Sequence, residues 1–210
     1  MKKALDILAW IVSIIFHPIG MPVLGCYILT WCITMPYFKD FIDFDYLKRL
    51  TIYFYILSIV FCFLYALFFI RDINYDSPKH RSMLLLLVIV NYVVGMFQPI
   101  SSQMFAPYLW GCILAMIIAY IVSQFWKISF HAIGMGGLLG LVFIIWIKKL
   151  FLLSEELAWI VPLVVLFSGL VGSARLYLNA HTPLQIYVGY LVGFISIATT
   201  SFLLTPSGIL

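Results

Sequence analysis

The chain alternates between long apolar runs and short polar segments. A helix that crosses a bilayer needs about 20 predominantly apolar residues, and backbone groups inside lipid must be hydrogen-bonded within the segment. The pattern therefore predicts an all-α, polytopic membrane helix bundle with six or seven transmembrane segments. The apolar runs cover about residues 5–34, 50–70, 83–98, 104–123, 130–150, 157–174 and 184–204.

The first apolar run is too long for one regular span and contains two breaks, His17-Pro18 and Met21-Pro22. Proline lacks an N–H donor and its ring clashes with the preceding helical turn. Two arrangements are consistent with these breaks. The run forms either one long kinked helix or two half-helices that re-enter the membrane.

The composition excludes a water-soluble globule. Hydrophobic residues make up 65% of the chain and charged residues 10%, whereas soluble domains carry about 25% charged residues. No repeat or linker divides the sequence, so residues 1–210 are expected to form a single integral-membrane domain. The net charge of +4 favours membrane lipids over nucleic acid, because basic residues between spans set topology or meet anionic lipids.

Three polar segments, about 71–81, 126–131 and 173–185, carry most of the candidate chemistry. Two predicted helices separate the first segment from the second, and two more separate the second from the third, so all three emerge on the same membrane face. Ionisable residues at a membrane are costly and are usually functional. The segments combine basic side chains with three of the four histidines, which predicts a binding site for an anion.

Two histidines among fixed cations, with no nearby carboxylate cluster, suit phosphoryl chemistry. One imidazole can attack phosphorus, a second can protonate the leaving oxygen, and the cations can stabilise the charged phosphate oxygens. None of the eight acidic residues lies near the second or third segment. Neither a metal nor a cofactor is expected.

The same segments resemble the signatures of the type 2 phosphatidic acid phosphatase (lipid phosphate phosphatase) superfamily. The stretch Arg175-Leu-Tyr-Leu-Asn-Ala-His181-Thr-Pro183-Leu-Gln185 is similar to its third signature, in which Arg precedes His and a final Asp. Ile128-Ser129-Phe130-His131 resembles the second signature, and Arg81 falls at the Arg of the first. The resemblance covers about residues 71–200 as a phosphatase-like core.

The resemblance implies a membrane lipid phosphatase that works through a phosphohistidine. His181 would be the nucleophile, His131 the general acid and Gln185 the residue that orients His181. The substrate would be a phosphate monoester or pyrophosphate of a lipid, of the phosphatidate, phosphatidylglycerophosphate or polyprenyl pyrophosphate type. The side chains expected to hold its phosphate are Arg175, Arg81, Lys127, Ser129 and Lys79.

The chain departs from these signatures at three informative positions. Asn74 stands where the family has Lys, Ala174 where it has Ser, and Gln185 where it has Asp. A glutamine amide oxygen can hold the His181 tautomer but supplies no charge. The sequence is thus compatible with a slow phosphatase and also with a protein that binds or moves a phosphorylated lipid without turnover. A small transporter of unrelated kind is a third, weaker alternative.

Several of these residues also have purely structural interpretations. His131 and His181 could each satisfy backbone groups at a helix end, and Lys127 could extend from the bilayer to the interface. His17 is expected to be a kink residue and is a weaker functional candidate. The glycines between residues 134 and 140 are typical of close helix packing, and the four cysteines are expected to be buried thiols.

The three polar segments at about 71–81, 126–131 and 173–185 are called the motif segments below. The basic residues outside them predict the orientation of the protein in the cell membrane. Five of them fall on the face opposite the motif segments, so the positive-inside rule places the candidate site on the extracytoplasmic face. Lys2 and Lys3 conflict with this orientation unless the first run is re-entrant. The five residues are Lys39, Lys48, Arg49, Lys148 and Lys149.

Overall fold

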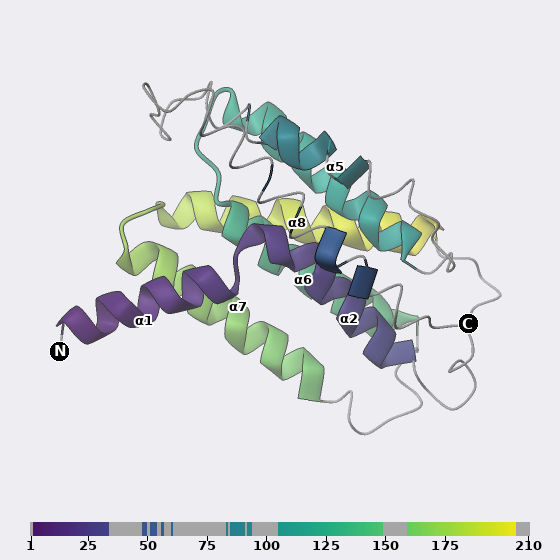
Figure 1. Ribbon diagram of the computed structural model, residues 1–210, viewed down its shortest axis with the longest axis horizontal. Coiled ribbons are helices and arrows are strands. Elements are labelled where there is room, and N and C mark those ends of the chain that lie inside the picture. Colours follow the sequence, from purple (N-terminus) through teal and green to yellow (C-terminus); the bar gives the residue numbers. More distant parts are fainter. Residues whose placement is uncertain are drawn as a thin grey trace.

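The computed structural model is built from helices throughout the residues it describes (Figure 1). It describes residues 2–33, 105–148 and 159–204, together with 48–49, 51–53, 56, 60, 83, 85–90 and 92–93. Its helices are α1 (Lys2–Ile15), the short 3₁₀ helix η1 (Pro18–Gly20), α2 (Met21–Ile33), α5 (Ala106–Ser123), α6 (Phe130–Ile147), α7 (Ile160–Tyr177) and α8 (Pro183–Leu204).

Five helical segments in the described part of the chain are long and apolar enough to cross a membrane. The all-α prediction is confirmed in the described residues, and the five long apolar helices indicate a multi-pass membrane protein. The apolar runs predicted at about 50–70 and 83–98 lie largely outside the described residues. The five segments are Lys2–Thr30, Ala106–Ser123, Phe130–Ile147, Ile160–Tyr177 and Pro183–Leu204.

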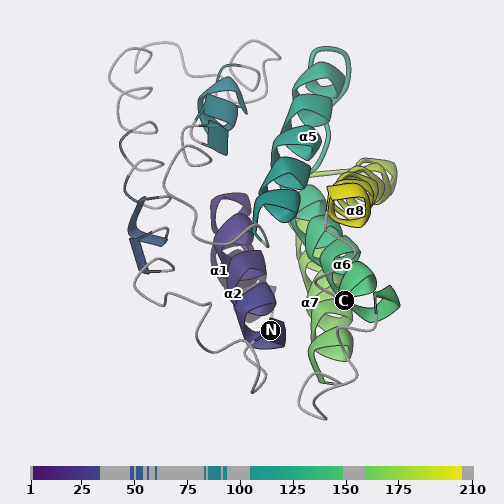
Figure 2. The same ribbon diagram turned by 90° about the vertical axis from the view of Figure 1, so that its right-hand side faces the viewer.

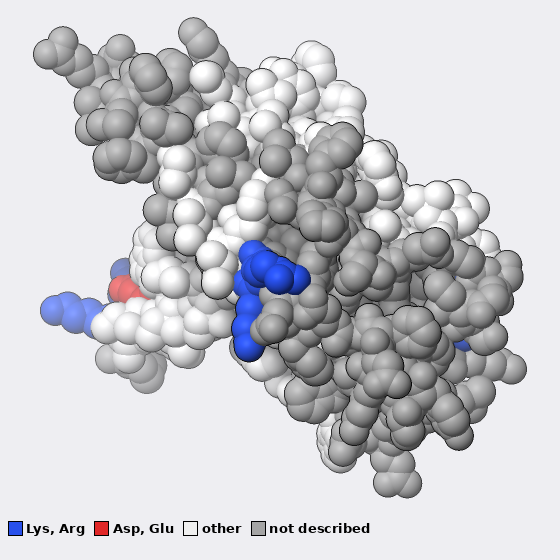
Figure 3. Space-filling model, turned by 45° about the vertical axis from the view of Figure 1, so that its right-hand side comes forward, with Lys and Arg blue, Asp and Glu red and all other residues white. Residues whose placement is uncertain are grey.

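The outer surface of these helices is apolar, as expected for side chains that face lipid. Large hydrophobic residues are exposed on several helices, among them Trp10, Trp146 and Leu203. Figure 3 shows the same character on one face, where Lys, Arg, Asp and Glu gather in a few places on an otherwise uncharged described surface. Soluble monomers rarely expose large hydrophobic side chains over several helices, and such surfaces are typical of contact with a membrane or another protein.

Helix α6 lies between α7 and α8 (Figures 1 and 2) and makes its most extensive contacts with α8. Glycines allow this close approach. A Cβ atom on Gly140 would lie 2.6 Å from the backbone oxygen of Phe194, and one on Gly193 would lie 2.7 Å from the backbone nitrogen of Gly137. The predicted packing role of the glycines in α6 is therefore confirmed at this interface.

The first apolar run is broken at the predicted place. Helix α1 ends at Ile15, η1 follows at Pro18–Gly20, and α2 begins at Met21. With 14 and 13 residues, α1 and α2 are each about 20 Å long, which is shorter than the bilayer core of about 30 Å. Because α2 leads away from α1 without turning back (Figure 1), the run is one broken helix and not a hairpin.

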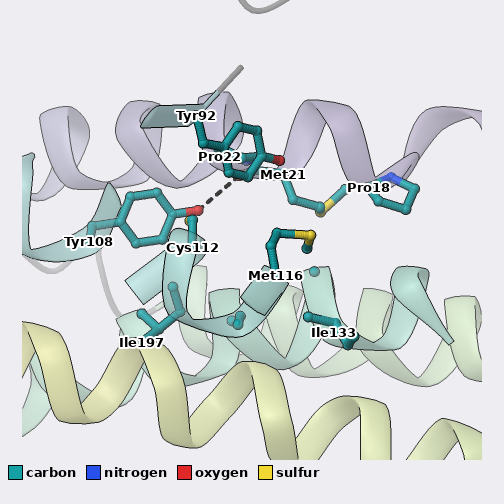
Figure 4. Close-up of a pocket in the computed structure, with 12 residues that line it drawn as sticks. Pro18, Met21, Pro22, Tyr92, Tyr108, Cys112, Met116, Ile133 and Ile197 are labelled. Carbon is teal, nitrogen blue, oxygen red and sulfur yellow. Dashed lines mark hydrogen bonds between the residues drawn. The ribbon is translucent and has the colours of Figure 1, made fainter. Parts of the chain in front are cut away.

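A small cavity adjoins this break (Figure 4). Pro18, Met21 and Pro22 line one side of it, and Tyr108 and Cys112 of α5 line another. The Tyr108 hydroxyl donates a 2.9 Å hydrogen bond to the Met21 backbone oxygen. The cavity volume is ≈ 20 Å³, which has room for about one water molecule, so it is too small for a lipid headgroup. Cys112 is a buried free thiol, as predicted.

Candidate functional site

The break after α1 releases one backbone oxygen for use by another helix. In a continuous helix the N–H of residue 18 would donate to Ile14 and that of His17 to Ser13. Pro18 has no N–H, and the His17 N–H donates to the Ile14 oxygen instead, at 3.3 Å. The Ser13 oxygen consequently loses its usual partner within the helix.

Helix α1 packs its few buried positions against α7, which it crosses in Figure 1. Ser13 is 4% exposed, and Ala9 on the same face is also buried. Near the start of α1, Asp6 accepts a 2.9 Å hydrogen bond from the Tyr177 hydroxyl. Most apolar side chains of α1 point away from the bundle and are exposed, so the polar face of this helix is the one that meets the protein.

Ser13 contacts two of the predicted site residues at once. Nε2 of His131 lies 3.0 Å from the Ser13 backbone oxygen. Nη1 of Arg175 donates to the Ser13 hydroxyl at 3.2 Å. A carbonyl oxygen can only accept a hydrogen bond, so the His131 proton in this contact is on Nε2.

Arg175 lies in the last turn of α7, which ends at Tyr177, three residues beyond the approximate end predicted for this span at 174. The helix then stops in a Schellman arrangement. The Asn179 N–H donates to the Leu176 oxygen at 2.9 Å and the Ala180 N–H to the Arg175 oxygen at 3.1 Å. Asn179 has a φ of 51°, a conformation that Asn tolerates better than most residues. This turn brings the chain back toward the bundle directly before His181.

His181 and Gln185 lie at the start of α8, where the sequence forms a capping box. The Gln185 backbone N–H donates to the Thr182 hydroxyl at 3.4 Å, and the Gln185 side-chain oxygen accepts from the Thr182 N–H at 3.0 Å. The same side-chain oxygen lies 3.3 Å from Nδ1 of His181. Since an amide oxygen only accepts, His181 carries a proton on Nδ1, and its neutral form has the lone pair on Nε2.

Ser129 joins the second and third motif segments. It is fully buried and caps α6, where its hydroxyl accepts from the Ala132 N–H at 3.4 Å. Its own N–H donates to the Gln185 backbone oxygen at 3.4 Å. Lys127 lies two residues earlier and is partly buried. The predicted placement of Ser129 and His131 at the start of a helix is correct.

Contacts bring His17, His131 and Arg175 together, and His181 is close enough to act on His131 electrostatically. His131 is within electrostatic range of Arg175, His17 and His181, and its ring centroid lies 5.7 Å from that of His17. Nε of Arg175 is buried and has no hydrogen-bond partner in the part of the chain that the structure describes. A buried charged donor without a partner is uncommon and suits a group that binds an anion.

Acidic groups are scarce among the residues that the structure describes. Asp6 is the one acidic side chain among the described residues, and within them no group of three or more His, Cys, Asp or Glu side chains could hold a metal ion. Arg81 and Lys79, predicted to hold phosphate, lie outside the described residues. Among the described residues, the site therefore combines the Arg175 guanidinium with histidine side chains, a composition that suits an anionic ligand.

Two residues of the site were missed or ranked too low from the sequence. Ser13 gave no signal, because a single serine in an apolar run is common. His17 gave a weak one, since a histidine inside a hydrophobic segment is costly, but its approach to His131 depends on how α1 packs. No protein-family model, curated protein or solved structure matches this chain.

Proposed function

We propose that this protein is a lipid phosphatase similar to the type 2 phosphatidic acid phosphatases, with six or seven transmembrane segments. It hydrolyses a phosphate monoester or pyrophosphate of a lipid through a phosphohistidine. The observation that carries the proposal is the contact between Nδ1 of His181 and the Gln185 side-chain oxygen. This contact gives His181 the tautomer that a nucleophilic imidazole requires.

In the first step, Nε2 of His181 attacks phosphorus and an N–P bond forms as the bond from phosphorus to the leaving oxygen breaks. The negative charge of the bound phosphate favours the imidazolium form of His131, which donates a proton to that oxygen, so the dephosphorylated lipid leaves with a neutral hydroxyl. Arg175, Lys127 and Ser129 hold the phosphate oxygens, together with Arg81 and Lys79 from the first motif segment. Their donors stabilise the charge that spreads over these oxygens in the transition state.

In the second step, water attacks the phosphorus of the phosphohistidine. His131, now neutral, accepts a proton from this water, and the N–P bond breaks to release inorganic phosphate. His181 regains its lone pair on Nε2 and His131 regains its proton, so the cycle closes without a metal or another cofactor. The use of one histidine first as acid and then as base follows from microscopic reversibility.

The neutral side chain of Gln185 is compatible with two candidate functions, a slow enzyme and a binding protein. Its oxygen fixes the His181 tautomer, but a neutral amide does not stabilise the charge that the ring develops when it bonds to phosphorus. The second candidate function is therefore binding or movement of a phosphorylated lipid without hydrolysis. It is favoured by the same neutral contact, and the two candidates differ in whether phosphate is released.

The proposed location is the cell membrane, with the site on the extracytoplasmic face. Lys148 follows α6 at the end opposite Ser129. By sequence, the positive-inside rule assigns Lys148 and the four other basic residues of the opposite face to the cytoplasm. Lys2 and Lys3 are the first two residues of α1, and the broken run that they begin does not turn back, so they count against this orientation. They are outnumbered by the five basic residues of the opposite face.

The test of the function is release of phosphate by purified protein from a panel of lipid phosphates in EDTA. The proposal expects release by the wild type, inhibition by orthovanadate and loss of release in His181→Ala. Gln124→Ala is a matched control, because Gln124 lies in the loop before Ser129 and its side-chain nitrogen donates to the Tyr120 oxygen. A requirement for Mg²⁺, or full activity in His181→Ala, contradicts the proposal.

A further inference from the structure

We propose that Ser13 of the first helix is a positioning residue of the site, holding His131 through its backbone oxygen and Arg175 through its hydroxyl. This inference rests on the proposed function, because it assigns the two contacts a role in binding and turnover of the phosphorylated lipid. It extends the site beyond the phosphatase-like core at 71–200, whose signatures include no residue from the first helix.

Ser13 makes two specific hydrogen bonds to site residues from a buried position. The side chain is almost fully buried, and two different oxygens of one residue serve two different site residues at 3.0 Å and 3.2 Å. A hydrogen bond to a charged donor stabilises more than one between neutral groups. Loss of the Ser13 hydroxyl would leave the Arg175 guanidinium with less support inside the protein.

The backbone contact has a cause in the sequence. Pro18 removes one helical N–H, the His17 N–H moves to the Ile14 oxygen, and the Ser13 oxygen becomes available to His131. The break therefore places an acceptor opposite the proposed general acid.

Each proposed catalytic imidazole then has one nitrogen held by an acceptor. Gln185 holds Nδ1 of His181, which directs Nε2 to the phosphorus. Ser13 holds Nε2 of His131, which assigns proton exchange with the lipid oxygen and water to Nδ1. The contact between Asp6 and Tyr177 ties the same helix to α7 at a second point, so the position of Ser13 does not depend on the site alone.

The first experiment separates the hydroxyl contact from general packing. Ser13→Ala removes the partner of Arg175 and keeps the backbone oxygen, so KM for dioctanoyl phosphatidate should rise about tenfold while kcat falls less than threefold. Ser13→Thr keeps a hydroxyl and should bring KM back to within about twofold of wild type. The matched control is Ser168→Ala, because Ser168 is buried on α7 and its hydroxyl donates to the Val164 oxygen.

The second experiment tests the backbone contact. Pro18→Ala supplies an N–H for the Ile14 oxygen, so the His17 N–H can return to Ser13 and compete with His131. We expect kcat to fall about tenfold with little change in KM. Pro22→Ala is the matched control. Pro22 lines the small apolar cavity, and its substitution leaves the Ser13 oxygen available to His131.

A parallel measurement keeps the inference testable if turnover is absent. Dioctanoyl phosphatidate should raise the thermal unfolding temperature of wild type and Ser168→Ala, and should raise that of Ser13→Ala much less at the same concentration. Wild-type protein that neither hydrolyses nor is stabilised by the lipid contradicts the proposed function, and this inference falls with it. A different result overturns this inference alone. In that result the wild type hydrolyses the lipid or is stabilised by it, Ser13→Ala behaves like Ser168→Ala, and Pro18→Ala behaves like Pro22→Ala.

Discussion

The side-chain oxygen of Gln185 lies 3.3 Å from Nδ1 of His181 and also accepts from the Thr182 N–H at 3.0 Å. One neutral amide therefore caps α8 and fixes the tautomer of the proposed nucleophile. A carboxylate of the same length could make both contacts, because Glu is a usual residue at this position of a capping box. The fold therefore does not require a neutral residue at this position, and the absence of a negative charge affects the chemistry of His181.

Gln185→Glu should increase kcat about tenfold, because a negative charge beside the ring stabilises the cationic form of His181 in a site shielded from water. Gln185→Asp should gain less, since its shorter side chain reaches Nδ1 poorly. The measurement is kcat for lipid phosphate hydrolysis in EDTA. Folded variants that both stay inactive while phosphatidate still binds would favour the binding protein over the slow enzyme.

Ser129→Ala should lower the free energy of unfolding by about 1 kcal/mol, because it removes the side-chain cap of α6. It should also raise KM, since Ser129 is proposed to contact phosphate. Ser123→Ala is the matched control, because Ser123 is equally buried but its hydroxyl donates to the Tyr120 oxygen within α5. Detergent-induced unfolding and phosphate-release kinetics check the two effects separately, and equal stability of the two variants would contradict the capping role.

Gly193→Ala should destabilise the bundle by about 1–3 kcal/mol, because the added methyl group would meet backbone atoms of α6 that cannot move aside. Gly169→Ala is the matched control on α7, where a Cβ atom meets nothing within 4 Å. There alanine should be neutral or stabilise the helix by up to about 1 kcal/mol. Thermal unfolding in detergent distinguishes the two variants, and a tolerated Gly193→Ala would contradict the close α6–α8 contact.

The hydrophobic pattern predicted much of the described fold. The run at 184–204 corresponds to α8 at Pro183–Leu204, and the run at 104–123 to α5 at Ala106–Ser123, because a long apolar helix is dictated by local composition. The break at His17-Pro18 was also predictable, since proline acts on its own helix. Helix α7 ends at Tyr177, three residues beyond the approximate end predicted at 174, because Arg175 and the two residues after it remain helical.

The candidate site was predictable only within each segment. Ser129 as a helix cap and Gln185 as the partner of His181 depend on spacings of a few residues, which the sequence displays. The contacts of Ser13 and His17 with α6 and α7 depend on how distant helices pack, which no local pattern encodes. The first run was therefore left outside the site, although the structure brings it to His131 and Arg175.

Orientation can be tested on described residues at the two ends of α6. Phe125, 89% exposed, lies in the loop before α6, and Lys148 follows its last turn. Phe125→Cys should react with a membrane-impermeant thiol reagent in intact cells, above the background of the parent protein, and Lys148→Cys should not. The reverse pattern would place the site in the cytoplasm and leave its chemistry unchanged.

The most direct test of the account is to trap the covalent intermediate. Protein incubated with a lipid carrying a ³²P-labelled phosphate, in EDTA, should become labelled within the first turnover, and the label should be stable in alkali and labile in acid, as an N–P bond is. His181→Ala should carry no label, whereas His131→Ala should still bind the lipid. Label that persists in His181→Ala, or phosphate release by wild type without any labelled protein, would contradict the phosphohistidine mechanism.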